Sequence, residues 1–218
     1  MALLLSTVQT QFGLYKKDIS DVGTDDLLQW LNFIGEQVYD AVKGTDPERY
    51  VDTSNTYTLT SSPQTEALPS DFGDIASWDM GFFEINVSAS KDTDRRLTRT
   101  GPGADIPGYY ITGNTNVIFT GIDDSSQYRL RYLPTRTDAT LLTEYFTLDG
   151  TLTGAPLIPD GKLQYLIKAL DVLYTQWDEM PGDEILADQR FARQLDQLIL
   201  NVRREPDAYG LPDYSVSY

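Results

Sequence analysis

The spacing of apolar residues changes along this chain of 218 residues, and the change limits the possible folds more than any other feature. Between Thr24 and Lys43 apolar residues recur every three or four positions, which predicts an amphipathic helix. From Thr53 they alternate with polar residues, which predicts half-buried strands. Two more helical segments follow, and residues 206–218 show neither period. We therefore expect an α+β fold: a helical bundle of three main helices with an inserted antiparallel β domain and an extended C-terminal arm.

These changes divide the chain into four expected segments. Residues 1–52 hold the N-terminal segment and the first bundle helix, residues 53–155 form the inserted β-rich domain, residues 156–205 form a helical hairpin that completes the bundle, and residues 206–218 form the arm. We expect the hydroxyl of Thr24 to cap the first helix and Gly44 to end it.

Short alternating runs predict the strands of the inserted domain. Tyr57 and Leu59 alternate with threonines, and Phe83, Ile85 and Val87 are expected to form the apolar face of another strand. Between them, the link Leu68–Gly73 carries two large apolar anchors, Leu68 and Phe72.

The clearest strand signal lies between Tyr109 and Leu133. Gly113-Asn114 separates two short strands and suits a tight primed hairpin turn. After a second turn, three apolar residues alternate with two arginines: Tyr128, Arg129, Leu130, Arg131 and Tyr132. We expect three consecutive antiparallel strands, a meander, that Pro134 ends because it has no amide to donate. Residues 141–154 predict either a small hairpin or an irregular return path.

Two helices are expected after the strands. Asp160 is a suitable cap for the first, whose apolar stripe consists of Leu163, Leu166 or Ile167, Leu170, Leu173 or Tyr174, and Trp177. Pro181-Gly182 breaks it, and a third helix then carries Ile185, Ala192, Leu195, Ile199 and Val202 on one side.

The chain contains no cysteine and no histidine. These absences exclude disulfides and cysteine nucleophiles, and they remove the commonest general base and zinc ligand. The carboxylate pairs Asp92/Asp94 and Asp123/Asp124 lack the glycine and closing glutamate of a calcium loop. Gly101-Pro102-Gly103 lacks the Lys-Ser or Lys-Thr of a phosphate loop, and nothing singles out a glycosidase-type carboxylate pair. We predict no catalytic, cofactor-binding or metal-binding residue, and hence no enzyme.

The formal net charge is −16, from 17 basic and 33 acidic residues. Such a chain has no overall electrostatic footprint for gripping DNA. The excess indicates either ordinary solubility or a surface that DNA passes without adhering. No segment approaches the roughly 20 apolar residues that cross a bilayer, and the start has no basic leader, so we expect a cytoplasmic, non-membrane protein.

Basic residues occur in small groups that suit contacts with a neighbouring acidic copy better than contacts with DNA. Arg95, Arg96 and Arg99 lie in one expected loop, and Arg129 and Arg131 lie on one strand face.

The arm, residues 206–218, has no period long enough to support its own structure. It contains two prolines, one glycine and three tyrosines. Rigid tyrosines are good anchors in the grooves of a partner. The candidate anchors are Tyr209, Leu211, Tyr214, Val216 and Tyr218; the alternative is an arm folded back on its own subunit.

Taken in order, these segments resemble the head–tail connector adaptors of tailed bacteriophages, including the gatekeeper type also called tail tubular protein A. The matching stretches are Thr24–Val42 with Trp30-Leu31-Asn32, Leu68-Pro69-Ser70-Asp71, Gly108–Asn114 with its continuation to Tyr132, and Leu157-Ile158-Pro159 with the helix pair. They match as a layout of patterns over most of residues 20–205.

The resemblance implies a structural virion protein at the head–tail junction, assembled in the host cytoplasm. It implies a ring of identical copies, twelve in this family, docked under the portal protein through the arm. The ring would extend the DNA channel without sequence-specific binding and offer a platform to the next tail component, a nozzle, stopper or tail tube. The five arginines then become candidates for contacts between subunits or with the next ring.

Two alternatives remain open from the sequence. One is another tail-completion or baseplate-side protein, whose arm binds a different ring. The other is a carbohydrate-binding or carbohydrate-active module that uses Trp78 or Tyr109–Tyr110 as a stacking platform.

Overall fold

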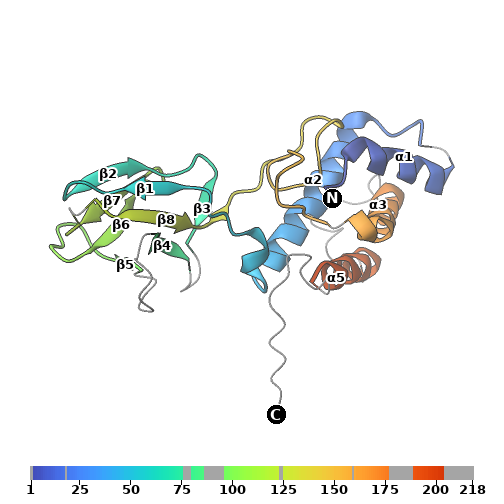
Figure 1. Cartoon of the computed structure of the whole chain (residues 1–218). Helices are drawn as coiled ribbons and strands as arrows, with labels where there is room; N and C mark the ends of the chain where they lie inside the picture. Colours follow the sequence, from blue (N-terminus) through green and yellow to red (C-terminus); the bar gives the residue numbers. More distant parts are fainter. Residues whose placement is uncertain are drawn as a thin grey trace, which may run out of the picture. The chain divides into compact units, whose positions relative to one another are not determined.

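A computed structural model describes residues 2–17, 19–75, 80–85, 96–122, 125–158, 160–176 and 189–203. The chain forms two compact units. Pro47–Arg136 form the strand unit, and Met1–Asp46 with Thr137–Tyr218 form the helical unit (Figure 1). The α+β class expected from the sequence is confirmed.

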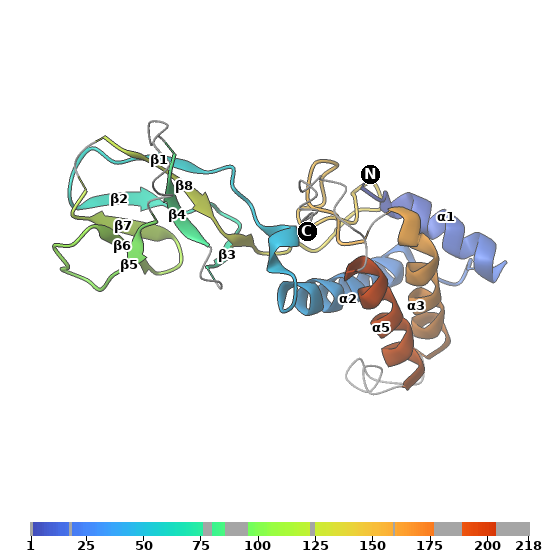
Figure 2. The ribbon, with the colours of Figure 1, turned by 60° about the horizontal axis from the view of Figure 1, so that its bottom comes forward.

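The helical unit contains four described α-helices: α1 (Leu5–Lys16), α2 (Thr24–Lys43), α3 (Leu163–Gln176) and α5 (Gln189–Arg203). Helix α3 packs against α1, α2 and α5, and α2 also packs against α5 (Figure 2). Edge-to-face rings join three of the helices, since Tyr174 of α3 contacts Phe12 of α1 and Trp30 of α2, with centroids 6.0 and 6.2 Å apart. Phe33 of α2 stacks on Phe191 of α5 at 5.8 Å.

Helix α1 was not expected from the sequence, because its N-terminus lacks the capping side chain that marks the start of a helix. Instead, the amides of Leu5 and Ser6 donate to the backbone oxygens of Glu144 and Leu142, at 3.0 and 2.9 Å. The first amides of a helix lack partners within the helix, and here a remote loop supplies them. The expectation of three main helices was therefore wrong, because the described residues alone contain four.

Helix α2 has the predicted bounds and ends at Gly44. Its cap differs from the expectation: Gly23 is the N-cap residue and its amide donates to Asp26 Oδ2 at 3.2 Å, while Thr24 already lies inside the first turn. Asp25 and Asp26 lie near the positive end of the helix dipole, as expected.

The two C-terminal helices bury most of the expected stripe. A short 3-10 helix, η2 (Asp160–Lys162), precedes α3, in which Leu166, Ile167, Leu170 and Leu173 are buried. In α5, Leu195, Ile199 and Val202 are buried, as are Phe191 and Leu198, which the predicted stripe did not include. Trp177, Pro181-Gly182 and Ile185 lie outside the described residues.

Residues 137–158 are irregular and belong to the helical unit. A single bridge, Thr147 to Pro156, closes a small turn, while Leu4 bridges to Tyr145. Asn32 of α2 holds the segment through two hydrogen bonds of 2.9 Å: its Nδ2 donates to Ala139 O, and its Oδ1 accepts from Ala139 N. Asn32 therefore pairs with the loop as a neighbouring strand would.

The strand unit contains three small sheets. Their strand orders are β1-β8-β4, β2-β7-β6-β5 and β3-β9. The bounds are β1 Thr56–Thr58, β2 Gln64–Ala67, β3 Phe72–Asp74, β4 Gly81–Glu84, β5 Thr98–Arg99, β6 Gly108–Thr112, β7 Asn116–Thr120, β8 Gln127–Arg131 and β9 Leu133–Pro134. A 3-10 helix, η1 (Pro47–Tyr50), precedes them.

The first two sheets share one apolar core. Tyr57, Phe82, Tyr128 and Leu130 come from the first sheet, and Tyr109, Val117 and Phe119 come from the second. The alternation of β8 is as predicted, because Tyr128, Leu130 and Tyr132 are buried while Arg129 is exposed.

The β6–β7 hairpin is confirmed, but the meander is wrong. Gly113 and Asn114 both have positive φ, 62° and 57°, as a primed turn requires. Strand β8, however, leaves this sheet and pairs with β1 and β4. Local patterns cannot tell which sheet a strand joins. The unit is also not wholly antiparallel, because β5 runs parallel to β6.

The apolar face of β4 was assigned to the wrong phenylalanine. Phe82 is fully buried, and its ring lies 4.7, 4.9 and 5.5 Å from those of Tyr109, Phe119 and Tyr57. Phe83 is half-buried on the other side of the strand, which ends at Glu84, and Val87 lies outside the described residues. Adjacent phenylalanines give no local signal for which of them faces the core.

The link Leu68–Gly73 anchors the end of the unit. Leu68 is buried, and the ring of Phe72 stacks on Tyr132 at 5.7 Å. The Tyr132 hydroxyl donates to Asp71 Oδ1 at 2.8 Å. Burial, followed by this hydrogen bond, raises the pKa of Tyr132 above its ordinary value. Phe72 pairs with Pro134, the last residue of β9.

Candidate interaction surfaces

The outer side of the β1-β8-β4 sheet carries a cluster that we call the arginine face: Phe83, Arg96, Arg129 and Arg131. Arg129 lies directly opposite Phe83 on β4 and Thr56 on β1. Directly opposed residues project from the same side of a sheet, as do residues two apart on one strand. Arg131 therefore joins them, and Arg96 bridges to Phe83 from the next segment.

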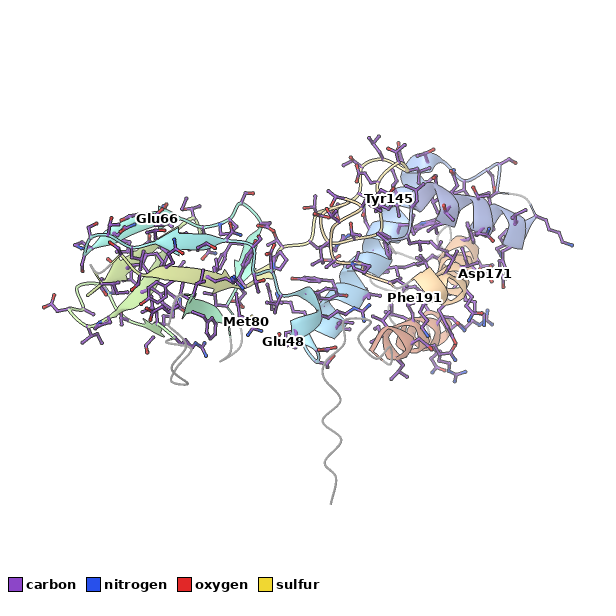
Figure 3. The ribbon with its side chains drawn as sticks, in the orientation of Figure 1. Glu48, Glu66, Met80, Tyr145, Asp171 and Phe191 are labelled. Atoms are coloured by element: carbon purple, nitrogen blue, oxygen red, sulfur yellow. The ribbon has the colours of Figure 1, made fainter. Side chains whose placement is uncertain are left out.

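Phe83 lies between two guanidinium groups. The Cζ atoms of Arg96 and Arg131 are 5.5 and 5.7 Å from its ring centroid, which is cation–π distance. Arg131 Nη2 also pairs with Glu48 Oε2 at 2.6 Å, and Arg96 Nη2 donates to the backbone oxygen of Met80; Figure 3 labels Glu48 and Met80. Both guanidinium groups are thus held in place before any partner arrives.

Arg129 differs from its neighbours. Its side chain is exposed, and its guanidinium makes no hydrogen bond or ion pair with any residue that the structure describes. Within the described part of the chain, Arg129 is thus an exposed cation of the arginine face that has no acidic partner.

Arg99 lies on β5 of the second sheet, where it is exposed and pairs with Tyr109 of β6. Burial raises the pKa of the Tyr109 phenol, and the nearby charges of Arg96 and Arg99 oppose that rise. The structure thus brings together three of the five predicted arginines, places Arg99 on the second sheet and leaves Arg95 outside the described residues.

Two contributors to this surface were missed from the sequence. Phe83 had been placed in the core, and Glu48 had been given no role. The identity of the outward phenylalanine depends on which side of β4 meets the second sheet. The pairing of Glu48 with Arg131 joins residues far apart in the chain. Neither fact has a signal in the local pattern.

The candidate arm anchors lie outside the described residues: Tyr209, Leu211, Tyr214, Val216 and Tyr218. The carboxylate pairs Asp92/Asp94 and Asp123/Asp124 and the candidate platform Trp78 also lie outside them. The other candidate platform for a sugar ring was Tyr109–Tyr110. Tyr109 is only 2% exposed, so its ring is not a platform, whereas Tyr110 is half-buried.

The helical unit carries most of the negative charge. Residues 47–136 hold 12 acidic and 8 basic residues, a net charge of −4, whereas the remainder holds 21 and 9, a net charge of −12. On α2 the exposed side is acidic, with Asp25, Glu36 and Asp40. Glu36 and Asp40 are one turn apart, and like charges at this spacing repel each other.

The described residues offer neither a cluster of metal ligands nor a membrane-spanning helix. They contain no group of three or more Asp, Glu, His or Cys side chains placed to hold a metal ion. Among them, no helix combines the length and the apolar character that crossing a bilayer requires.

The comparison with protein families agrees with this picture of a chain that works through its surfaces. The SU10 adaptor protein family matches residues 2–214, nearly the whole chain. The chain matches no curated protein. The resemblance first suggested by the order of the segments is confirmed. The chain therefore belongs to the SU10 adaptor protein family: it is a phage head–tail adaptor, a structural protein and not a member of an enzyme family.

Proposed function

We propose that copies of this chain form a ring under the portal protein of a tailed phage, extend the DNA channel and offer a platform to the next tail component. The observation that carries the proposal is the extent of the family match, residues 2–214. The match includes both compact units and ends at Tyr214, so it covers residues 206–214 of the arm and leaves Val216 and Tyr218 outside it.

The arm is the part that grips the portal. Its three tyrosines, with Leu211 and Val216, provide rigid aromatic and aliphatic anchors along a segment interrupted by prolines. A segment without a period of its own becomes ordered when it binds, and part of the contact energy then offsets the lost entropy. Such an arm ties assembly of the ring to the presence of the portal template.

Membership of an adaptor family supports a ring of identical copies. Twelve identical copies would place two different complementary patches of each chain in contact around the axis, as a closed cyclic ring requires. The strand unit would face the next ring, a nozzle, stopper or tail tube. The adaptor would be located in the virion at the head–tail junction, after assembly in the host cytoplasm.

The charge of the chain fits a passive channel. A net charge of −16 per copy repels phosphate groups instead of retaining them, so DNA slides past the ring without sequence-specific binding.

The test is a truncation after Glu205. We expect the shortened chain to keep its circular dichroism spectrum and melting temperature, because the described helices and strands of both units are formed by residues 5–203. It should fail to sediment with purified portal rings, whereas the full chain sediments with them.

A matched pair of variants separates anchoring from arm length. Replacing Tyr209, Tyr214 and Tyr218 with alanine should abolish attachment, whereas replacing Ser215 and Ser217 with alanine should leave it unchanged. Normal attachment of the truncated chain to the portal would refute the role of the arm. Attachment of the full chain to a different tail ring, and not to the portal, would favour a tail-completion or baseplate-side protein.

A further inference from the structure

We propose that the arginine face of the strand unit is a docking site for an acidic surface on the helical unit of a second copy of this chain. The inference rests on the proposed ring and names the patch through which neighbouring copies meet. It begins from the clustering of Arg96, Arg129 and Arg131 around Phe83.

Three positively charged side chains lie close together on this face. Arg129 and Arg131 project from the same side of β8, and Arg96 reaches the same phenylalanine from the neighbouring segment. Like charges on adjacent positions of one sheet face repel each other. Glu48 neutralises Arg131, but the exposed guanidinium of Arg129 has no partner within the described part of the chain. An anionic partner at this face would remove the repulsion.

The face is also organised in advance. Arg96 is held by the ring of Phe83 and the oxygen of Met80, and Arg131 is held by the same ring and by Glu48. Less side-chain freedom is then lost when a partner binds. Arginine and large aromatic residues are the types enriched at the centres of protein–protein interfaces.

Charge complementarity selects the partner. The helical unit carries −12 of the total charge of −16, and the exposed side of α2 presents Asp25, Glu36 and Asp40. A contact between the arginine face of one copy and the helical unit of the next uses two different patches, which is the type of contact that a ring repeats. DNA is the less favourable partner, because the net charge of the whole chain repels it.

A photo-crosslinker at the arginine face tests the proposal directly. Thr56 is exposed and directly opposite Arg129, so Thr56→p-benzoylphenylalanine leaves all three arginines intact. The unlabelled variant is mixed with ¹⁵N-labelled unmodified chain, assembled on portal rings and irradiated. We expect cross-links of mixed isotope composition that join the light strand unit to heavy peptides of the helical unit.

Each other outcome overturns the proposal. Cross-links confined to light peptides would place the contact within one chain. Cross-links to the portal, to DNA or to the strand unit of another copy would identify a different occupant.

A charge reversal measures the contribution of the contact. We expect Arg129→Glu to raise the concentration that fills the portal ring by about tenfold or more, measured as copies per ring by native mass spectrometry. Arg99→Glu makes the same charge change on the second sheet and should remain within about twofold of the unmodified chain. Both residues are exposed, and circular dichroism checks that both variants fold.

The two proposals fail in different ways. Equal filling by Arg129→Glu and the unmodified chain would refute the docking site while leaving portal binding intact. Absence of portal binding by the unmodified chain would refute the proposed function. Cross-linking of the concentrated chain alone would then still test the contact between copies.

Discussion

Replacing Phe82 with alanine should destabilise the strand unit more than replacing Phe83, although the two residues are adjacent and of the same type. Phe82 is fully buried and its ring contacts three others, at centroid distances of 4.7, 4.9 and 5.5 Å. Phe83 lies on the outer side of the same strand, half-buried between Arg96 and Arg131.

The expected losses of stability differ by about twofold. Deleting a buried phenylalanine costs about 3–5 kcal/mol, because the transfer free energy of the ring is lost and a cavity remains. Phe82 also loses aromatic contacts, so we expect Phe82→Ala to lie at the upper end, about 4–5 kcal/mol. Phe83→Ala loses two exposed cation–π contacts of about 0.5–1 kcal/mol each and about 1 kcal/mol of partial burial, for a total of about 2–3 kcal/mol.

Calorimetry combined with hydrogen exchange measures both effects. For a unit of this size, 1 kcal/mol shifts the melting temperature by about 4–8 °C, so Phe82→Ala should lower the transition of the strand unit by about 16 °C or more. Peptides from Pro47–Arg136 should lose exchange protection, while peptides from α2, α3 and α5 keep theirs. Equal costs for the two substitutions, or a larger cost for Phe83→Ala, would refute the assigned side of β4.

Three further perturbations have outcomes set by single contacts. Asn32→Ala should cost about 1–3 kcal/mol in thermal unfolding, because both hydrogen bonds to Ala139 are lost and the loop amide and carbonyl lose their partner. Burial raises the pKa of Tyr57 from 10.0 to about 12. The stability that the unionised phenol contributes is therefore constant below pH 10 and is lost as the pH rises from 10 to about 12. In alkaline unfolding followed by tyrosine absorbance, the free energy of unfolding of Tyr57→Phe should fall less steeply with pH than that of the unmodified chain. Gly121→Ala should destabilise the strand unit by more than about 1 kcal/mol, since φ is +65° and a Cβ would lie 2.7 Å from the Ile106 backbone, whereas Gly101→Ala, with open space around it, should be neutral in the same melt.

These three predictions have clear contrary results. An unchanged melting temperature for Asn32→Ala would mean that the loop does not depend on the side chain. An identical alkaline transition in Tyr57→Phe would mean that this phenol does not link stability to pH. Equal melting of the Gly121 and Gly101 variants would contradict the close backbone approach at Gly121.

The sequence predicted correctly those elements whose bounds are set by residues within the element itself. Helix α2 has its expected bounds because its period, its acidic first turn and Gly44 all lie within one segment. The β6–β7 hairpin follows from Gly113-Asn114, two residues that tolerate positive φ. The alternation along β8 correctly placed Tyr128 and Leu130 inside the core.

Elements that depend on remote contacts could not be predicted in this way. Helix α1 is capped by the backbone of residues 142–144, which no residue near Leu5 indicates. The partner of β8 is set by packing of two sheets, and the same packing decides that Phe82 faces inward. The arginine face was anticipated in part as a list of residues. The contacts of its arginines with the Phe83 ring and the ion pair with Glu48 could not be predicted, because they join residues far apart in the sequence.

An electron cryomicroscopy map of the head–tail junction in the intact particle tests the central claim most directly. We expect a ring of this chain between the portal and the next tail component, with density for residues 206–218 on the portal surface. Density for the chain at the baseplate, or residues 206–218 folded against their own subunit, would contradict the account.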